Sequence, residues 1–408
     1  MGRRLPALLA AVALAAAGAR AELAAEPVGR VFTLPATPAP HWFWLTDILL
    51  HRTALFDADS GDLLGTLSAG TAGLGFVIAP LFSKDRREIY LAESYYARGV
   101  RGERTDVVNV YDAQSLAPLH EIAIPPKRAE YFPGNAANAL SDDGRFVAVF
   151  NVTPATSLTV VDVRERRFVT EVGAPGCGLA FAAGPRRFLM LCGDGGALAV
   201  TVDAAGASAA AERIAPFFDP NADPLTEKAV RRGNEWLFVS FEGVVQPVDV
   251  SGPAIRPGEP WPLFGEDDRR ASWRVGGGQH LAVHAASGRL YALVHQGEKD
   301  THKEPGREVW VYDLATRARV QRIEVGNPLA ALVRQQAGVE RGGATSWLLD
   351  TLLPNPGVGQ ILVTQDESPV LVAVGEGPAS VLVHDARSGK LLREIGEAGI
   401  ASTLLYAP

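Results

Sequence analysis

Short β-rich runs recur along the chain, and each of them ends at an aspartate that is followed by a turn. Runs of Val, Leu, Thr and aromatic residues bounded by Gly, Pro and Ser predict short strands. Seven such runs occur, at 53–57, 108–112, 158–162, 198–203, 245–249, 309–313 and 381–385. The aspartate side chain at the end of each run is suited to accept a hydrogen bond from the backbone two residues further on, which defines the turn.

The seven runs divide the chain into repeats of the size of propeller blades. Their aspartates are 41 to 72 residues apart, and roughly 55 residues per unit lies near the kelch period. A four-stranded blade cannot bury both faces alone, so ring closure buries each face on the next blade and leaves only short edges. We therefore predict an all-β fold, a seven-bladed β-propeller, in one domain over residues 22–408. Two β-sandwiches in tandem are the alternative, although no Pro-, Gly- and Ser-rich linker divides the chain.

One interval is too long for a single blade. Asp313 and Asp385 are 72 residues apart, which exceeds one repeat by roughly 20 to 30 residues. We place an insertion at about 328–359. Long insertions on a rigid scaffold often carry function, and a tolerated surface excursion is the alternative.

Residues 1–21 are predicted to be a secretory signal peptide. Arg3 and Arg4 precede the apolar run 5–18, which is shorter than the roughly 20 residues that cross a bilayer. Ala19-Arg20-Ala21 has the form of a cleavage site. A buried N-terminal helix is the alternative. We expect an exported mature chain that begins at Glu22 and has no membrane span.

Composition narrows the classes of function. The chain has 39 Lys and Arg against 46 Asp and Glu, a net charge of −7, which is unlike a nucleic-acid-binding protein. Its two cysteines exclude a disulfide-rich scaffold, a four-cysteine zinc site and an iron–sulfur cluster held by this chain alone.

The two cysteines are placed to pair with each other. Cys177 and Cys192 flank two short apolar runs joined by the turn Gly184-Pro185-Arg186, and a hairpin of these runs would bring them side by side. Export places them where disulfides persist. We predict a Cys177–Cys192 disulfide, with two free buried thiols as the alternative.

Motifs for self-contained chemistry are scarce. There is no phosphate-binding glycine loop, nucleophile elbow or zinc-protease helix motif in the sequence. Residues 57–62 are similar to the start of a calcium loop, but they occupy a repeated turn position and lack the later bidentate glutamate. His280 and His284 would share one face of a strand. Since no third ligand is near them in the sequence, we interpret them as core or surface histidines.

Several segments carry a family resemblance. They are 97–106, with an Arg-Gly-x-Arg-Thr-Asp run before the strand 108–112; 273–279, leading to His284 and 288–291; 301–303; Cys177 and Cys192 with Asp194-Gly195; and 384–389. Their order and spacing over roughly residues 50–400 resemble the heavy subunit of the quinoprotein amine dehydrogenases, that is, the methylamine and aromatic amine dehydrogenases. In that family the heavy chain has a single disulfide at the position of the two cysteines.

The resemblance implies an assembly in the periplasm. It implies a seven-bladed propeller in an α2β2 heterotetramer, whose cofactor, tryptophan tryptophylquinone, belongs to a small disulfide-rich light subunit. A primary amine would be oxidised to aldehyde and ammonia, and the electrons would pass to a small copper protein or a c-type cytochrome. For this chain it implies no cofactor, no metal and no catalytic residue, but a role in holding the light subunit.

The resemblance also implies a contribution to the substrate channel. In the family, a Phe in a Gly-Gly-Phe-Leu-Pro segment lies near the channel, and the corresponding segment here is 72–77. Leu74 or Phe76 would take that position, and ordinary blade core is the alternative. Two other classes of function compete: a stand-alone exported binding propeller, and a propeller enzyme with its own metal or haem.

Overall fold

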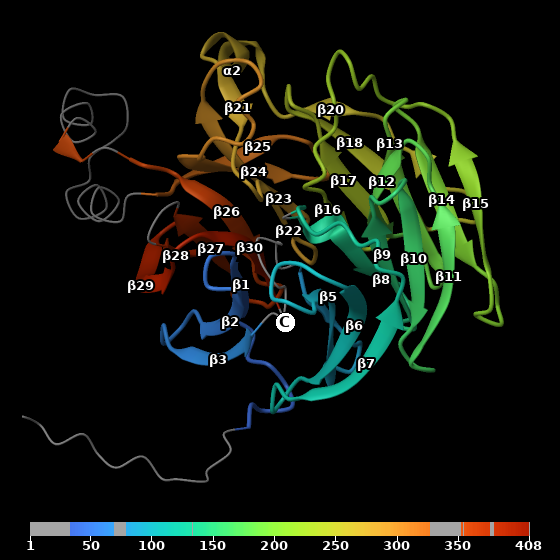
Figure 1. The fold of residues 1–408 in the computed structure, drawn as a ribbon. Coiled ribbons are helices and arrows are strands. Elements are labelled where there is room, and N and C mark those ends of the chain that lie inside the picture. The colour runs from blue at the N-terminus through green and yellow to red at the C-terminus, as the bar shows by residue number, and fades with distance from the viewer. Residues whose placement is uncertain are drawn as a thin grey trace, which may run out of the picture. The chain divides into compact units, whose positions relative to one another are not determined.

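Seven antiparallel sheets of four or five strands follow one another around a central axis (Figure 1). The computed structural model describes residues 33–68, 79–132, 134–326, 352–353, 355–375 and 379–407, and residues 34–408 form one compact unit. The predicted all-β, seven-bladed propeller is confirmed, and the tandem-sandwich alternative is wrong. The helices of the described part are one turn of 3-10 helix, η1 (Asn135–Ala137), and one short helix, α2 (Glu266–Arg270).

The first four blades contain four strands each, and each blade is described from its inner to its outer strand. Blade 1 consists of β30 (Ser402–Tyr406), β1 (Trp42–Asp47), β2 (Arg52–Asp57) and β3 (Leu63–Ser68). Blade 2 consists of β4 (Leu81–Phe82), β5 (Glu88–Tyr96), β6 (Arg104–Asp112) and β7 (Pro118–Ile124). Blade 3 consists of β8 (Asn138–Leu140), β9 (Phe146–Asn151), β10 (Ser157–Asp162) and β11 (Arg167–Gly173). Blade 4 consists of β12 (Cys177–Ala182), β13 (Arg187–Cys192), β14 (Ala197–Val202) and β15 (Ala209–Ile214).

The remaining three blades are less regular. Blade 5 consists of β16 (Val230–Arg232), β17 (Glu235–Val239) and β18 (Val244–Asp249), which pairs with both β19 (Arg256–Pro257) and β20 (Trp261–Pro262). In blade 6, β21 (Trp273–Val275) and β22 (Leu281–His284) both pair with β23 (Arg289–Gln296), followed by β24 (Glu308–Asp313) and β25 (Arg319–Glu324). Blade 7 consists of β26 (Val358–Val363), β27 (Val370–Gly375), β28 (Ala379–Asp385) and β29 (Leu391–Gly399).

Every predicted aspartate-terminated run forms the third strand of its blade, counted from the centre. These strands are β2, β6, β10, β14, β18, β24 and β28. In five of them an aspartate oxygen accepts the N–H two residues on, as in Asp57 with Asp59 (2.8 Å) and Asp313 with Ala315 (2.9 Å). The repeated turn is therefore a local, side-chain-stabilised feature, and residues 57–62 are one instance of it.

Apolar side chains fill the interfaces between neighbouring blades. One buried cluster joins blades 1, 2 and 3, and others lie between blades 3 and 4, 4 and 5, 5 and 6, 6 and 7, and 7 and 1. Trp310 and Phe238 are fully buried within them. Because apolar area is removed from water at each blade contact, the ring is stable only as a whole.

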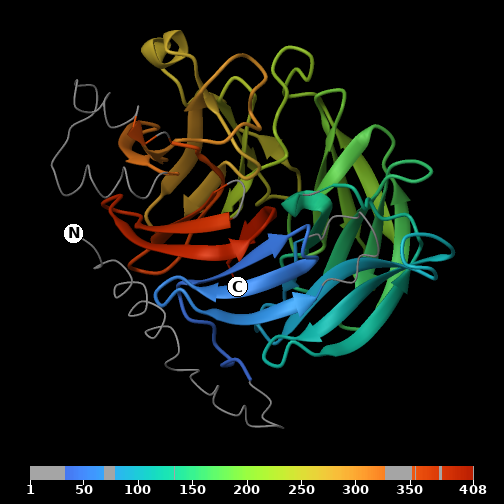
Figure 2. The same ribbon diagram turned by 60° about the vertical axis from the view of Figure 1, so that its left-hand side comes forward.

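The chain closes the ring by placing its last strand in its first blade. β30 pairs antiparallel with β1, with Trp44 opposite Tyr406, and Figure 2 shows blade 1 in blue beside the red C-terminal strands. The carboxylate of Asp47 accepts four backbone N–H groups, from Leu49 and Leu50 on one side and from Ile400 and Ala401 on the other. Although burial acts in the opposite direction, these hydrogen bonds lower the pKa of Asp47.

Gln279 links three inner strands on the same side of the ring. Its Nε2 donates to the carbonyl oxygens of Leu405 (2.7 Å) and Ile361 (3.3 Å), and its Oε1 accepts from Leu405 N–H (3.1 Å). One side chain thus holds β22, β26 and β30 together.

Two predicted segments lie wholly or largely outside the described residues. The predicted signal peptide, 1–21, is wholly outside them, as is most of the predicted insertion, 328–359. Val358 and Gly359 belong to β26. In the described part of the chain, no helix has the length and apolar character to cross a membrane.

Candidate functional site

The inner strands of blades 2 to 5, together with Gly278, Gln279 and Leu281 of blade 6, surround a cavity of about 550 Å³ near the axis. Small residues explain the space, because Gly134, Ala136, Ala139, Ala180, Ala182 and Ala229 all line it. Aromatic side chains form the apolar part of the wall, and they are Phe82, Phe181 and Trp236. The rings of Phe181 and Trp236 meet edge-to-face at 5.2 Å, and Trp236 Nε1 donates to the carbonyl oxygen of Ala182 at 2.7 Å.

Among the described residues, three cations and one carboxylate line the same cavity. Lys84 and Arg86 lie in the turn between β4 and β5, while Glu227 and Lys228 precede β16. Ser83 Oγ fixes the turn by donating to Asp85 at 2.7 Å. Lys228 is only 10% exposed, and its Nζ lies 3.0 Å from Glu227 Oε1. Burial opposes ionisation of Glu227, but the adjacent ammonium group of Lys228 outweighs it and lowers the pKa of this carboxyl.

Asn138 lines the cavity and has one buried acceptor without a partner. Its side chain is 2% exposed and its Nδ2 donates to the carbonyl oxygen of Ala79 at 3.1 Å. Its Oδ1 is buried and has no hydrogen-bond partner. A buried acceptor without a donor is unfavourable by about 1–3 kcal/mol.

The pKa values of two histidines near Lys228 are lowered. His280 is fully buried and its Nε2 lies 3.0 Å from Thr226 Oγ1. Burial, with a smaller contribution from Lys228, lowers the pKa of His280 to about 3. His302 stacks on Phe241 with ring centroids 3.6 Å apart, and burial, followed by the charges of Lys228 and Lys303, lowers its pKa too.

The two histidines singled out in the sequence do not form a joint site. His284 contacts Ser287 Oγ (2.7 Å) and the carbonyl oxygen of Asp366 (3.0 Å), at the junction with blade 7, whereas His280 contacts Thr226, which precedes blade 5. Within the described ranges, no group of three or more His, Cys, Asp and Glu residues is arranged to hold a metal ion.

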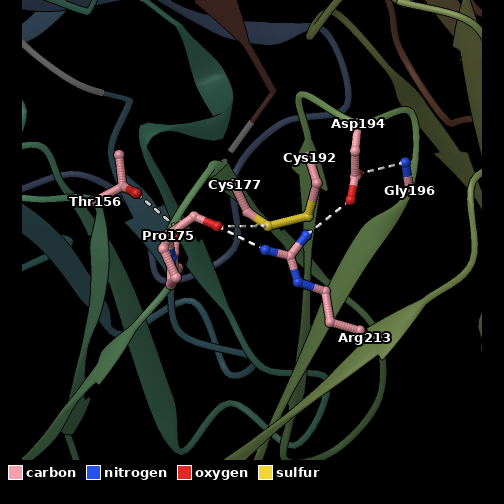
Figure 3. Close-up of a disulfide and its surroundings, with 8 residues drawn as sticks. Thr156, Pro175, Cys177, Cys192, Asp194, Gly196 and Arg213 are labelled. Atoms are coloured by element: carbon pink, nitrogen blue, oxygen red, sulfur yellow. Dashed lines mark hydrogen bonds and ion pairs between the residues drawn. A yellow bond between two sulfur atoms is a disulfide. The ribbon is translucent and has the colours of Figure 1, made fainter.

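The predicted disulfide is present in the first hairpin of blade 4. Cys177 on β12 lies directly opposite Cys192 on β13 and is bonded to it. Figure 3 shows Arg213 beside the bond, donating to the carbonyl oxygen of Pro175 (2.7 Å) and to Asp194 (3.2 Å). The disulfide thus joins the two inner strands, and Arg213 on the outer strand β15 connects Pro175 and Asp194 near it.

The channel candidates lie outside the described residues. Leu74 and Phe76 belong to 69–78, which joins β3 to β4. Pro80, two residues after this segment, lines the cavity. The sequence analysis did not identify the charged residues of the cavity. A Ser-x-Asp turn follows an inner strand at 83–85 and again at 141–143, and this pattern could have indicated that Lys84 lies near the axis.

Residues 48–340 match the methylamine dehydrogenase heavy chain (MADH) family. The methylamine dehydrogenase heavy chain of Methylophilus methylotrophus is 26% identical over 377 residues, covering 91% of this chain and 84% of the relative. That of Paracoccus versutus is also 26% identical, over 348 residues, covering 85% of this chain and 73% of the relative.

Solved structures share the fold at lower identity. The periplasmic gluconolactonase PpgL of Pseudomonas aeruginosa superposes with a TM-score of 0.54 at 15% identity, over 90% of this chain and 98% of that one. Dihydro-heme d1 dehydrogenase NirN gives 0.53 at 18% identity, over 93% of this chain and 78% of that one. These likenesses concern the fold alone. The family match spans most of the blades, from β2 through blade 6, and on that ground the chain belongs to the methylamine dehydrogenase heavy chain family.

Proposed function

We propose that this chain is the heavy subunit of a periplasmic amine dehydrogenase that contains tryptophan tryptophylquinone in its light subunit. The complex oxidises a primary amine to an aldehyde and ammonia and passes the electrons to a small copper protein or a c-type cytochrome. The observation that carries the proposal is the family match over residues 48–340. The chain's own part is to hold the light subunit in an α2β2 heterotetramer and to line part of the substrate channel.

The tryptophans of this chain support a cofactor in the partner. Two tryptophan rings meet in the described part, Trp273 and Trp310, with centroids 4.8 Å apart. Trp310 is fully buried, and the guanidinium of Arg322 lies 5.1 Å from both rings. This pair is part of the core of blade 6, and its buried setting does not suit a quinone that must meet a substrate.

We expect a neighbouring reading frame to encode a small Cys-rich protein, and co-expression of that protein with this chain tests the assembly. We expect the two proteins to co-purify and the complex to reduce a dye when a primary amine is added, while this chain alone is colourless and inactive. Amine-dependent dye reduction by this chain alone would contradict the proposal. A monodisperse chain that never binds such a partner would favour the alternative of a stand-alone binding propeller.

We further propose that Leu74 or Phe76 lies at the channel mouth. The support is the correspondence of 72–77 to the family's channel-lining segment. An apolar side chain at the mouth would discriminate amines by about 1–3 kcal/mol per methylene and would exclude water. In the complex, Leu74→Ala or Phe76→Ala should change the ratio of kcat/KM for methylamine and a bulky amine. Leu63→Ala, at an exposed position on outer strand β3, is the matched control, and equal ratios in all variants would remove the channel role.

Export follows from the same proposal. Protein recovered from a periplasmic extract should begin at Glu22 when its N-terminus is sequenced. An intact Met1 in that fraction would contradict the signal peptide.

A further inference from the structure

We propose that the central cavity is a binding site for an organic anion with an apolar body, such as an aryl carboxylate. The site would lie wholly within this chain. It goes beyond the proposed amine oxidation and does not rest on it.

The charge of the wall is the first argument. The protein has a net charge of −7, yet the described lining residues carry three cations, Lys84, Arg86 and Lys228, against the single carboxylate of Glu227. Throughout the described part of the chain, neither Lys84 nor Arg86 has an acidic group within ion-pair distance. Two of the three positive charges are therefore not compensated by protein.

The recess strengthens the field of Lys228 most, because Lys84 and Arg86 are exposed. A recess with low-dielectric walls concentrates the potential of the charges that line it. Lys228 is one-tenth exposed, so its charge is screened less than that of a surface lysine. A carboxylate gains from such a wall, whereas a protonated amine is repelled. The cavity is therefore complementary to an anion and not to the ammonium form of an amine.

The uncharged part of the cavity wall indicates the chemistry of the rest of the ligand. Phe82, Phe181 and Trp236 supply an apolar surface, and the indole is oriented by its hydrogen bond to Ala182. Asn138 Oδ1 is a buried acceptor without a donor. A volume of about 550 Å³ lies in the range of small-molecule sites, which are mostly apolar with a few placed polar groups. An aromatic acid, with its ring on the apolar wall and its carboxylate toward the cations, fits these features.

Calorimetric titration of the purified full chain with three probes of one shape tests the charge argument. The probes are phenylacetate, the neutral phenylacetamide and the cationic phenethylamine. A charge-assisted contact contributes about 1.5–3 kcal/mol, so we expect phenylacetate to bind at least roughly tenfold more tightly than phenylacetamide and phenethylamine not to bind. Equal affinities, or preference for the amine, would overturn the proposal, as would the absence of phenylacetate binding.

Variants of the wall locate the site. Lys84→Gln with Arg86→Gln should weaken phenylacetate binding roughly tenfold, because two exposed cations are each worth about threefold after screening. Arg87→Gln is the matched control, since Arg87 lies in the same turn, is exposed and does not line the cavity. Unchanged affinity in the double variant, or equal loss in the control, would overturn the assignment.

A variant that binds phenylacetate more tightly is a further test, because a misfolded protein would bind it less tightly. Glu227→Gln removes the one described carboxylate and frees the Lys228 ammonium group, so phenylacetate should bind severalfold more tightly. Weaker or unchanged binding would count against the site. Because these titrations use this chain alone, their failure leaves the amine dehydrogenase proposal untouched, and loss of amine oxidation in the complex leaves this one untouched.

Discussion

The inner strands are packed differently on the two sides of the ring's centre, although the blades are built from the same repeat. On the side of blades 6, 7 and 1, the inner strands β22, β26 and β30 are held together by Gln279. On the side of blades 2 to 5, the inner strands β4, β8, β12 and β16 form most of the cavity wall, which Gln279 and Leu281 of blade 6 complete, and small residues leave about 550 Å³ unfilled. The first side, called the closing side below, connects the first and last strands by hydrogen bonds. The second side, called the open side, leaves room for a ligand.

The difference lies in the side chains of the inner strands, because the sheets themselves are alike. On the closing side, Asp47 is satisfied within the protein by four backbone N–H groups. The open side leaves the Oδ1 of Asn138 and the charges of Lys84 and Arg86 without protein partners in the described part of the chain, and it has the Cys177–Cys192 bond in its inner hairpin. The two sides therefore differ most clearly in the uncompensated charges of Lys84 and Arg86, since unpaired buried polar atoms such as Trp44 Nε1 and His384 Nε2 also occur in blades 1 and 7.

The largest expected effect comes from removing the covalent link on the open side. The double variant Cys177→Ser/Cys192→Ser should lower the free energy of unfolding by about 3 kcal/mol, since a bond that closes a loop of this length restricts the unfolded chain. Urea unfolding with and without reductant measures it. Reductant should destabilise the wild type and leave the double variant unchanged, and mass mapping that finds two free thiols in the exported protein would contradict the pairing.

The closing side should depend on Gln279. Gln279→Ala leaves the N–H and carbonyl groups of Leu405 without this partner in the core, so we expect a loss of about 2 kcal/mol in the free energy of unfolding. Gln296→Ala is the control, because Gln296 is exposed and donates one hydrogen bond to Ala271. Equal urea midpoints for the two variants would show that Gln279 does not hold the inner strands.

A larger side chain should be tolerated on the open side better than at a close-packed position. Ala182 lines the cavity, so Ala182→Val should change the free energy of unfolding by less than about 0.5 kcal/mol, whereas Ala148, which is fully buried in β9, has no such space. Ala148→Val should lower the free energy of unfolding by about 1 kcal/mol or more through overpacking. The two thermal or urea transitions compare them directly, and similar losses would mean that the cavity is not free space.

The smallest effect concerns a histidine between blades 1 and 7. His41 lies 2.8 Å from Asp59 and 3.2 Å from Asp366. Burial lowers its pKa, but the two carboxylates outweigh burial and raise it above the ordinary value. The protonated ring therefore favours the folded state: its contribution is complete below pH 6.5 and is lost as the pH rises through the folded pKa.

That contribution should be below about 1 kcal/mol, because Asp59 is largely exposed. The difference in stability between wild type and His41→Gln, measured by urea unfolding from about pH 5.5 to about 8.5, should shrink as the pH rises. His120→Gln, at an exposed position on β7, is the control. A difference that stays constant or grows with pH would reverse the assigned sign.

Much of the fold was predictable because its signals are local. Each turn after a third strand is stabilised by an aspartate within a few residues, as with Asp112 and Ser115, and the disulfide joins two strands of one hairpin. The closing strand β30 was not predicted, because Trp44 pairs with Tyr406 and no local pattern specifies a partner so far along the chain. The channel candidates Leu74 and Phe76 stay predictions.

The sequence by itself determined the number of blades, the turn that ends each third strand and the pairing of the two cysteines, since these depend on residues close together in the chain. Only the tertiary structure decided which residues meet at the axis. Lys84 and Lys228 come from blades 2 and 5, and in the sequence both resemble ordinary surface lysines. They line one cavity because ring closure brings inner strands from distant repeats together, and the small side chains between them leave the space unfilled.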